Sequence, residues 1–223
     1  MKENYDKKTR KLEVLYIEKG LNPYTSKIFI QYDKDGKKTS NYNLAERRFQ
    51  GIAIPKYSGG LSTHLQYKGV FLDATVYFTG GHKVYERYAQ FYLRTNNFTT
   101  VTYNGDAELL DAWQKAGDVT DVPKITYSGN DNFHSTSSRH LYDGTFARLK
   151  DITLGYEVPS QYLEGTGFDG VTFTLRGTNL YTWVKDSGLK LDPEVGNRNN
   201  TMGYTTLTTP PVKSVVFGVN LKF

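Results

Sequence analysis

Residues 214–223 read SVVFGVNLKF, and their side chains alternate between two faces. One face carries Val215, Phe217, Val219, Leu221 and Phe223; the other carries Ser214, Val216, Gly218, Asn220 and Lys222. A repeat of two residues is the period of a β-strand, because successive side chains point to opposite sides of the chain. The stretch therefore predicts a strand with one apolar face. Its length suits a tilted membrane strand of about 9–11 residues.

The same alternation recurs upstream and extends the prediction to the whole chain. It is found at 12–17, 61–67, 70–78, 151–158 and 171–176. Pro159 ends the fourth of these segments, because proline cannot donate a ladder hydrogen bond. We therefore expect an all-β protein of about six antiparallel strands.

The connections between these strands differ in length on the two sides of the expected sheet. Lys68-Gly69 is a tight turn and 159–170 is a modest one, whereas 18–60, 80–145 and 183–211 are long. Structureless loops of that length are uncommon in compact soluble domains. Short turns on one side and long loops on the other are typical of outer-membrane barrels, whose smallest members have about eight strands. The sequence thus predicts an incomplete transmembrane β-barrel with long extracellular loops.

Composition agrees with a strand-rich chain and limits its chemistry. The 223 residues include 18 Tyr, 12 Phe and 21 Gly, but no Cys, which excludes disulfides and thiolate catalysis. The net charge of +5 comes from 28 basic and 23 acidic residues, and the basic clusters are short and lie beside acidic residues. Dispersed charge of this kind argues against a nucleic-acid partner.

Three patterns that resemble functional motifs do not support a catalytic or cofactor site. Residues 165–170 match G-x-G-x-x-G, but a strand follows them where a dinucleotide site needs a helix. The four histidines have no metal-ligand spacing, and Pro193 between Asp192 and Glu194 indicates a turn. We predict no enzyme activity, no metal and no cofactor.

Aromatic residues near the ends of the strands are candidates for contact with a ligand or a lid. They are Tyr85, Tyr88, Tyr92, Tyr181 and Trp183. Aromatic rings stack well on sugars, and a binding site would add a few placed polar groups. An interfacial aromatic girdle or simple loop packing explains the same residues.

Taken together in order, six segments resemble the C-terminal part of the SusC/RagA family of TonB-dependent outer-membrane transporters. They are IPKYSGGLSTHLQYKGVFLDATVYFTGGHKVY (54–85), DAWQKAGDVTDVPK (111–124), YDGTFARLKDITLGYEVP (142–159), RGTNLYTW (176–183), LDPEVG (191–196) and PPVKSVVFGVNLKF (210–223). Residues 19–53 resemble the preceding extracellular loop of the family. The resemblance covers nearly the whole chain, so we expect 1–223 to be the C-terminal part of the barrel, without the plug domain and the signal peptide.

The resemblance implies a large barrel of about 22 strands that is filled by a plug. Such a protein lies in the cell outer membrane and imports oligosaccharides or peptides, with energy relayed by the TonB complex. It implies as partners a SusD-like surface lipoprotein over the loops, outer-membrane lipid around the wall, and the barrel-assembly machinery. That machinery would read a signal like the one formed here by Phe217, Gly218, Leu221 and Phe223.

The composition also permits a soluble β-sandwich module that binds glycans. In the barrel, the apolar face of each strand meets lipid and the polar face lines the lumen. In the sandwich, the apolar faces of two sheets are buried against each other. The exposure of the apolar face therefore separates the two hypotheses.

Overall fold

The computed structural model divides into two compact units. The first comprises residues 1–54, 82–143 and 188–208, and the second comprises residues 55–81, 144–187 and 209–223. Side chains are described at 35, 44, 49–87, 107–120, 122, 124, 137–194, 203–205 and 209–223. Backbone alone is described at 5–6, 11–15, 17–21, 28–30 and 47–48.

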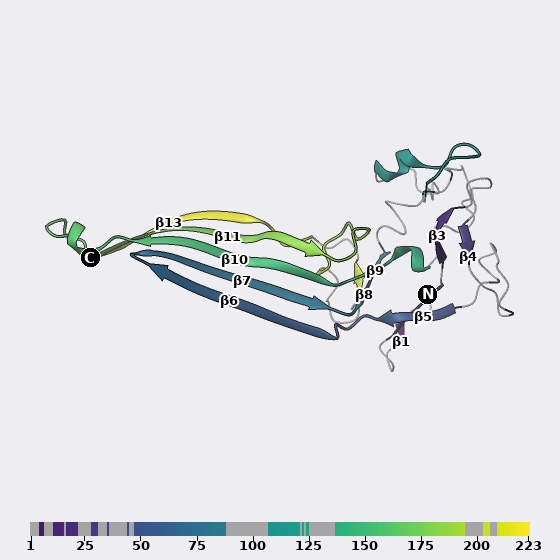
Figure 1. Cartoon of the computed structure of the whole chain (residues 1–223), viewed down its shortest axis with the longest axis horizontal. Coiled ribbons are helices and arrows are strands. Elements are labelled where there is room, and N and C mark those ends of the chain that lie inside the picture. The colour runs from purple at the N-terminus through teal and green to yellow at the C-terminus, as the bar shows by residue number, and fades with distance from the viewer. Residues whose placement is uncertain are drawn as a thin grey trace. The chain divides into compact units, whose positions relative to one another are not determined.

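The second unit is a five-stranded antiparallel sheet with the strand order β13-β11-β10-β7-β6 (Figure 1). Its strands are β6 (Tyr57–Tyr67), β7 (Val70–Gly80), β10 (Phe146–Glu157), β11 (Gly170–Val184) and β13 (Ser214–Lys222). They contain from 9 to 15 residues, which is enough to cross a bilayer at a tilt. The sheet is open, with β6 and β13 at its edges.

The strand register places apolar side chains in rows across one face of the sheet. Residues that are directly opposite each other on neighbouring strands share a face. One row contains Leu65, Leu72, Leu154, Leu175 and Phe217. The next row toward the short turns contains Tyr67, Val70, Tyr156, Phe173 and Val219. The apolar face expected from the alternation is confirmed for these strands.

The opposite face carries the polar rows. They contain Ser62, Thr75, Asp151, Thr178 and Ser214; then His64, Asp73, Thr153, Arg176 and Val216; then Gln66, Phe71, Gly155, Thr174 and Gly218. Val216 and Phe71 are the apolar members of these three rows. The alternation expected at 151–158 and 171–176 thus places Thr153, Gly155 and Thr174 on the face opposite the apolar rows.

The short connections have the expected turn chemistry. Lys68 and Gly69 both have positive φ, at 48° and 85°, as a two-residue type I′ hairpin requires. Gly165 and Gly167 also have positive φ, and β11 begins at Gly170, so the G-x-G-x-x-G stretch is a turn. Between β10 and this turn lies the short 3-10 helix η6 (Ser160–Tyr162).

β10 and β11, like β6, are longer than the alternation predicted, and β6 begins at Tyr57 instead of Leu61. β10 begins at Phe146 instead of Asp151, and β11 continues to Val184 instead of Arg176. The pairing of both strands shifts between Leu149 and Asp151, and Asn179 has a φ of 53°. A β-bulge interrupts the two-residue period, so the pattern was lost where the strand itself continues.

The first unit is built of short strands. β8 (Lys83–Glu86) pairs with β9 (Leu141–Asp143) and with β12 (Tyr204–Thr205). β2 (Lys11–Leu15) pairs with β1 (Tyr5–Asp6) and β5 (Arg47–Ile52), and β3 (Ile17–Leu21) pairs with β4 (Ile28–Ile30). The segment predicted as a strand at 12–17 therefore falls in β2 and β3 and does not join the five-stranded sheet. Two 3-10 helices, η4 (Ala107–Asp111) and η5 (Ser138–His140), complete the unit's described elements.

Within the described residues, no helix is both long enough and apolar enough to cross a membrane.

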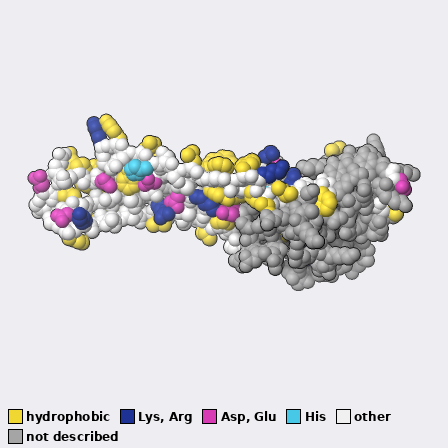
Figure 2. All heavy atoms as spheres, turned by 90° about the horizontal axis from the view of Figure 1, so that it is seen from below, with side chains coloured by type: hydrophobic (Ala, Val, Ile, Leu, Met, Phe, Trp, Pro, Cys, Tyr) yellow, Lys and Arg dark blue, Asp and Glu magenta, His cyan; other side chains and the backbone are white. Residues whose placement is uncertain are grey.

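The apolar face of the five-stranded sheet is exposed. Leu65, Leu154 and Leu175 are 59%, 51% and 47% exposed. Figure 2 shows hydrophobic side chains, in yellow, along the surface of the described strands. A β-sandwich buries such rows under a second sheet. The sandwich alternative is therefore not the fold of this unit.

Gly155 supports one tightly packed contact on the polar face, and it gives a testable prediction. A Cβ atom at Gly155 would overlap the ring of Phe71 on the neighbouring strand. We expect Gly155→Ala to lower the free energy of unfolding by about 1–3 kcal/mol, as overpacking typically does. Urea titration of the folded protein in lipid vesicles measures the change.

Gly60→Ala is the matched control, because a Cβ atom there meets only the carbonyl oxygen of Val76 at 3.8 Å. Phe71→Ala should reduce the cost of Gly155→Ala, since it removes the ring that the new methyl group would strike. Equal costs in the presence and absence of the Phe71 ring would contradict the packing argument.

Candidate functional site

The polar face of the five-stranded sheet is a network of paired side chains. His64 Nδ1 lies 2.6 Å from Asp73 Oδ1, and Gln66 donates to Glu157 at 3.2 Å. Arg176 donates to both carboxylate oxygens of Asp151, at 2.6 and 2.8 Å. Such bidentate pairs fix the direction of both groups.

This network does not assemble a nucleophile with its base. Ser62 Oγ lies 3.0 Å from Thr75 Oγ1, so its hydrogen bond runs along its own row and not to His64. An activated serine needs its hydroxyl within hydrogen-bond reach of the base. The arrangement instead forms a polar wall, with the placed charges that a water-filled lumen allows.

In the other unit, Glu86 is a fully buried carboxylate at the end of β8. Its Oε1 atom accepts hydrogen bonds from the backbone N–H groups of Lys190 and Leu191, both at 3.0 Å. A buried charge is tolerated when several donors satisfy it. Lys190 also reaches the Glu108 carboxylate, with 3.6 Å between Nζ and Oε1. Glu86 thus attaches residues 190–191 to β8, and Lys190 extends the connection to η4.

Tyr85, one of the expected contact residues, belongs to the core of the same unit. It is 1% exposed, and its ring centroid lies 5.4 Å from that of Tyr204 and 6.2 Å from that of His140. Its backbone N–H donates to the Gly203 carbonyl at 2.6 Å. In this conformation Tyr85 packs the unit and presents no ring surface to a ligand. The expected contacts at Tyr88 and Tyr92 lie outside the described residues.

Tyr181 and Trp183, the other expected contacts, lie on β11. Their rings are in edge contact, with centroids 4.7 Å apart, and the residues are 54% and 51% exposed. They therefore form an accessible aromatic pair.

The residues of the expected assembly signal lie on β13 and directly after it. Phe217, Leu221 and Phe223 are 65%, 44% and 80% exposed. Thr174 Oγ1 donates to the Gly218 carbonyl at 3.4 Å and occupies the space that a side chain at 218 would need. The apolar residues of the signal are thus available on the surface of the sheet.

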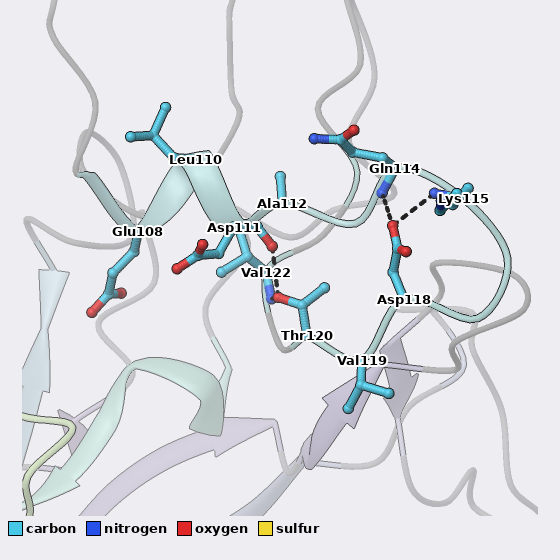
Figure 3. A pocket seen from close by; sticks show the side chains of 10 residues that line it. All are labelled: Glu108, Leu110, Asp111, Ala112, Gln114, Lys115, Asp118, Val119, Thr120 and Val122. Atoms are coloured by element: carbon cyan, nitrogen blue, oxygen red, sulfur yellow. Dashed lines mark hydrogen bonds between the residues drawn. The ribbon is translucent and has the colours of Figure 1, made fainter.

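η4 and the segment that follows it line an open pocket of about 750 Å³ (Figure 3). The Asp118 carboxylate turns back and accepts hydrogen bonds from Lys115 N and Gln114 N, at 2.9 and 3.0 Å. These backbone donors, led by Lys115, hold the pKa of Asp118 below its usual range. The Asp118 side chain therefore stabilises the turn of its own loop. η4 is a short 3-10 helix that ends at Asp111, and Gly117, with a φ of 98°, lies in the loop after it.

Sequence reasoning missed the buried polar residues. Glu86, His140 and Arg148 are at most 1% exposed, although side chains of these types are usually found at the surface or only partly buried. Burial also lowers the pKa of His82, which favours its neutral form. The expected turn at Asp192 is confirmed, because its side chain accepts the Glu194 N–H at 2.9 Å.

Comparison with curated proteins identifies relatives along most of the chain. No family model matches the sequence. TonB-dependent receptor P26 of Formosa agariphila is 31% identical over 184 residues, which is 78% of this chain and 17% of the relative. TonB-dependent receptor P3 of the same organism is 27% identical over 210 residues, which is 88% of this chain and 19% of the relative. The chain thus spans less than a fifth of the length of these relatives.

Solved structures agree with the sequence relatives. The RagAB peptide transporter matches with a TM-score of 0.76 and 26% identity over 96% of this chain and 22% of its own. The RagAB peptide importer in its closed-closed state matches with a TM-score of 0.73 and 27% identity over 96% of this chain and 23% of its own. With the open sheet and its alternating faces, these similarities show that the chain belongs to the SusC/RagA family of TonB-dependent outer-membrane receptors and corresponds to a C-terminal part of their β-barrel.

Proposed function

We propose that this chain forms part of the wall of a TonB-dependent importer that takes up a nutrient across the outer membrane. The observation that carries the proposal is the five-stranded sheet, with one exposed apolar face and one face of paired polar groups. A wall between lipid and a water-filled lumen requires these two faces. Energy would come from the TonB complex through parts of the receptor outside this chain.

Peptides and oligosaccharides are both candidate nutrients. The similarity to a structure described as a peptide importer supports peptides. Oligosaccharides are the other substrate class that the resemblance to the SusC/RagA family implies. For either nutrient class, we propose that this chain contributes part of the barrel wall and its long loops, and no enzymatic step.

We further propose that a SusD-like surface lipoprotein covers the loops at 80–145 and 183–211. The described part of these loops has an ordered base, because Glu86 holds Lys190 and Leu191 by hydrogen bonds. A firmly held loop base suits a surface that a lid must meet repeatedly in one geometry.

Deletion of the receptor gene tests the function. We expect the deletion strain to lose growth on one nutrient class, either a peptide mixture or a glycan mixture as the limiting source, and to grow normally on free amino acids and monosaccharides. A plasmid copy of the receptor should restore growth. Unchanged uptake of every oligomer tested would contradict the importer function.

Purification tests the proposed partner. A tagged receptor purified from native membranes should carry a surface lipoprotein with it.

Cysteine labelling of intact cells tests the topology, and this chain has no cysteine of its own. Val119→Cys, at a site 96% exposed, should react with a membrane-impermeant maleimide from outside. Tyr162→Cys, in the short connection after β10 and 67% exposed, should react only after the outer membrane is permeabilised. The reverse pattern would place the long loops in the periplasm.

The assembly signal remains a proposal, and Phe223 allows a controlled test. Its ring lies 5.2 Å from that of Phe168, so deletion of Phe223 removes both a packing contact and a recognition element. We expect deletion to reduce the folded, heat-modifiable receptor in the outer membrane several-fold at equal synthesis. Phe168→Ala removes only the packing contact and should have a small effect. Equal losses in the two variants would contradict a recognition role.

A further inference from the structure

The alternation of β10 contains a conflict between sequence and environment. From Tyr156 back to Ile152, the even-numbered side chains lie on the apolar face of the sheet. If this alternation continued, Lys150 and Arg148 would lie on the same face as Leu154. Charged side chains near the centre of a lipid-facing strand cost several kcal/mol in membrane barrels.

The strand register resolves this conflict at one residue. Between Asp151 and Leu149, two steps along β10 correspond to only one step along the neighbouring strand β7, from Thr75 to Val76. Lys150 is the extra residue of a β-bulge. Beyond it, Leu149 is opposite Val76, and Ala147 is opposite Phe78. Leu149 and Ala147 therefore continue the apolar face beyond the bulge, and Arg148 lies on the opposite face.

Side-chain contacts agree with this change of face. Lys150 Nζ lies 5.6 Å from the ring centre of Tyr77, which has the same parity on β7 as Asp73 and Thr75. The Arg148 guanidinium lies 5.5 Å from the ring centre of Phe146. Arg148 is 1% exposed, whereas Trp183, directly opposite Ala147, is 51% exposed. Arg148 and Trp183 therefore point to different sides of the sheet.

The change of face adds two rows to the apolar surface. Between the short turns and the bulge there are four apolar rows. The first contains Val171 and Leu221, and the fourth contains Ile152 and Val215. Beyond the bulge lie Leu61, Val76, Leu149 and Tyr181, and then Gly59, Phe78, Ala147 and Trp183. Rows are roughly 6.7 Å apart along a strand, or about 5 Å in height at a tilt near 40°. Four rows then span about 15 Å and six span about 25 Å, the height of the apolar band of membrane barrels.

We propose that the bulge at Lys150 extends the lipid-contacting surface of the receptor to the row of Phe78 and Trp183 while it turns Arg148 and Lys150 inward. The partner of this surface is the bilayer, with acyl chains up to the row of Leu149 and Tyr181 and the headgroup region beginning at the row of Trp183. Aromatic pairs with one polar edge suit that boundary. The inference rests on the proposed outer-membrane function, and it assigns Tyr181 and Trp183 to lipid and not to a transported ligand.

Depth-dependent quenching in the full receptor tests this assignment. A fluorophore is attached to single cysteines at Ala147 or Leu149, and the receptor is reconstituted in phosphatidylcholine vesicles with or without brominated acyl chains. Ile152→Cys is the lipid-facing control, and Thr182→Cys is the inward-facing control in the row of Arg148. We expect bromination to lower the emission at Leu149 by about half, as at Ile152, and to leave Thr182 nearly unchanged.

Quenching at Ile152 without quenching at Leu149 would overturn the proposed change of face. Absence of quenching at both positions would instead contradict the placement of the sheet in the membrane, so the two failures are distinguishable. Charge substitution gives a second readout. Leu149→Arg should lower the amount of folded receptor about tenfold, and Thr182→Arg should lower it much less. Equal losses would also overturn the proposal.

Discussion

The need to pair every backbone hydrogen-bonding group determines how the five-stranded sheet can be stable. A strand in lipid has no water to satisfy its N–H and C=O groups, so each group must find a partner in a neighbouring strand. Among the described strands, β7, β10 and β11 are paired on both sides, whereas β6 and β13 each pair on one side. Both edges of the sheet therefore require further strands of the receptor. The sheet is a sector of a closed wall, and its stability belongs to the whole barrel.

The two faces of the sheet meet different physical demands. On the apolar face the side chains need only be hydrophobic, and the rows of Leu, Val and Phe satisfy this demand. On the polar face the charges are arranged in pairs, such as Asp151 with Arg176 and His64 with Asp73. Exposed pairs of this kind contribute little to stability. Their effect is to fix the directions of charged groups along the polar face of the sheet.

Much of the fold could be predicted from the sequence, because a two-residue period is a local property. It located the strands at 61–67, 70–78 and 214–223 and the faces of their side chains. It failed at 146–151 and after Arg176, because a bulge or a residue with positive φ adds residues without changing composition. The buried residues were missed for another reason. Glu86 binds backbone atoms 104 positions away, and a distant N–H group leaves no trace in the sequence around a carboxylate.

The attachment of β8 to two separate stretches has a consequence for the evolution of this protein. Glu86 holds Lys190 and Leu191 by hydrogen bonds, and the pairing of β8 with β12 holds Tyr204 and Thr205, so one short strand anchors two stretches that are distant from it in sequence. The first attachment depends on a single side chain, whereas the second depends on backbone pairing. Substitution of Glu86 would therefore be costly in evolution, whereas the pairing with β12 constrains side-chain identity much less.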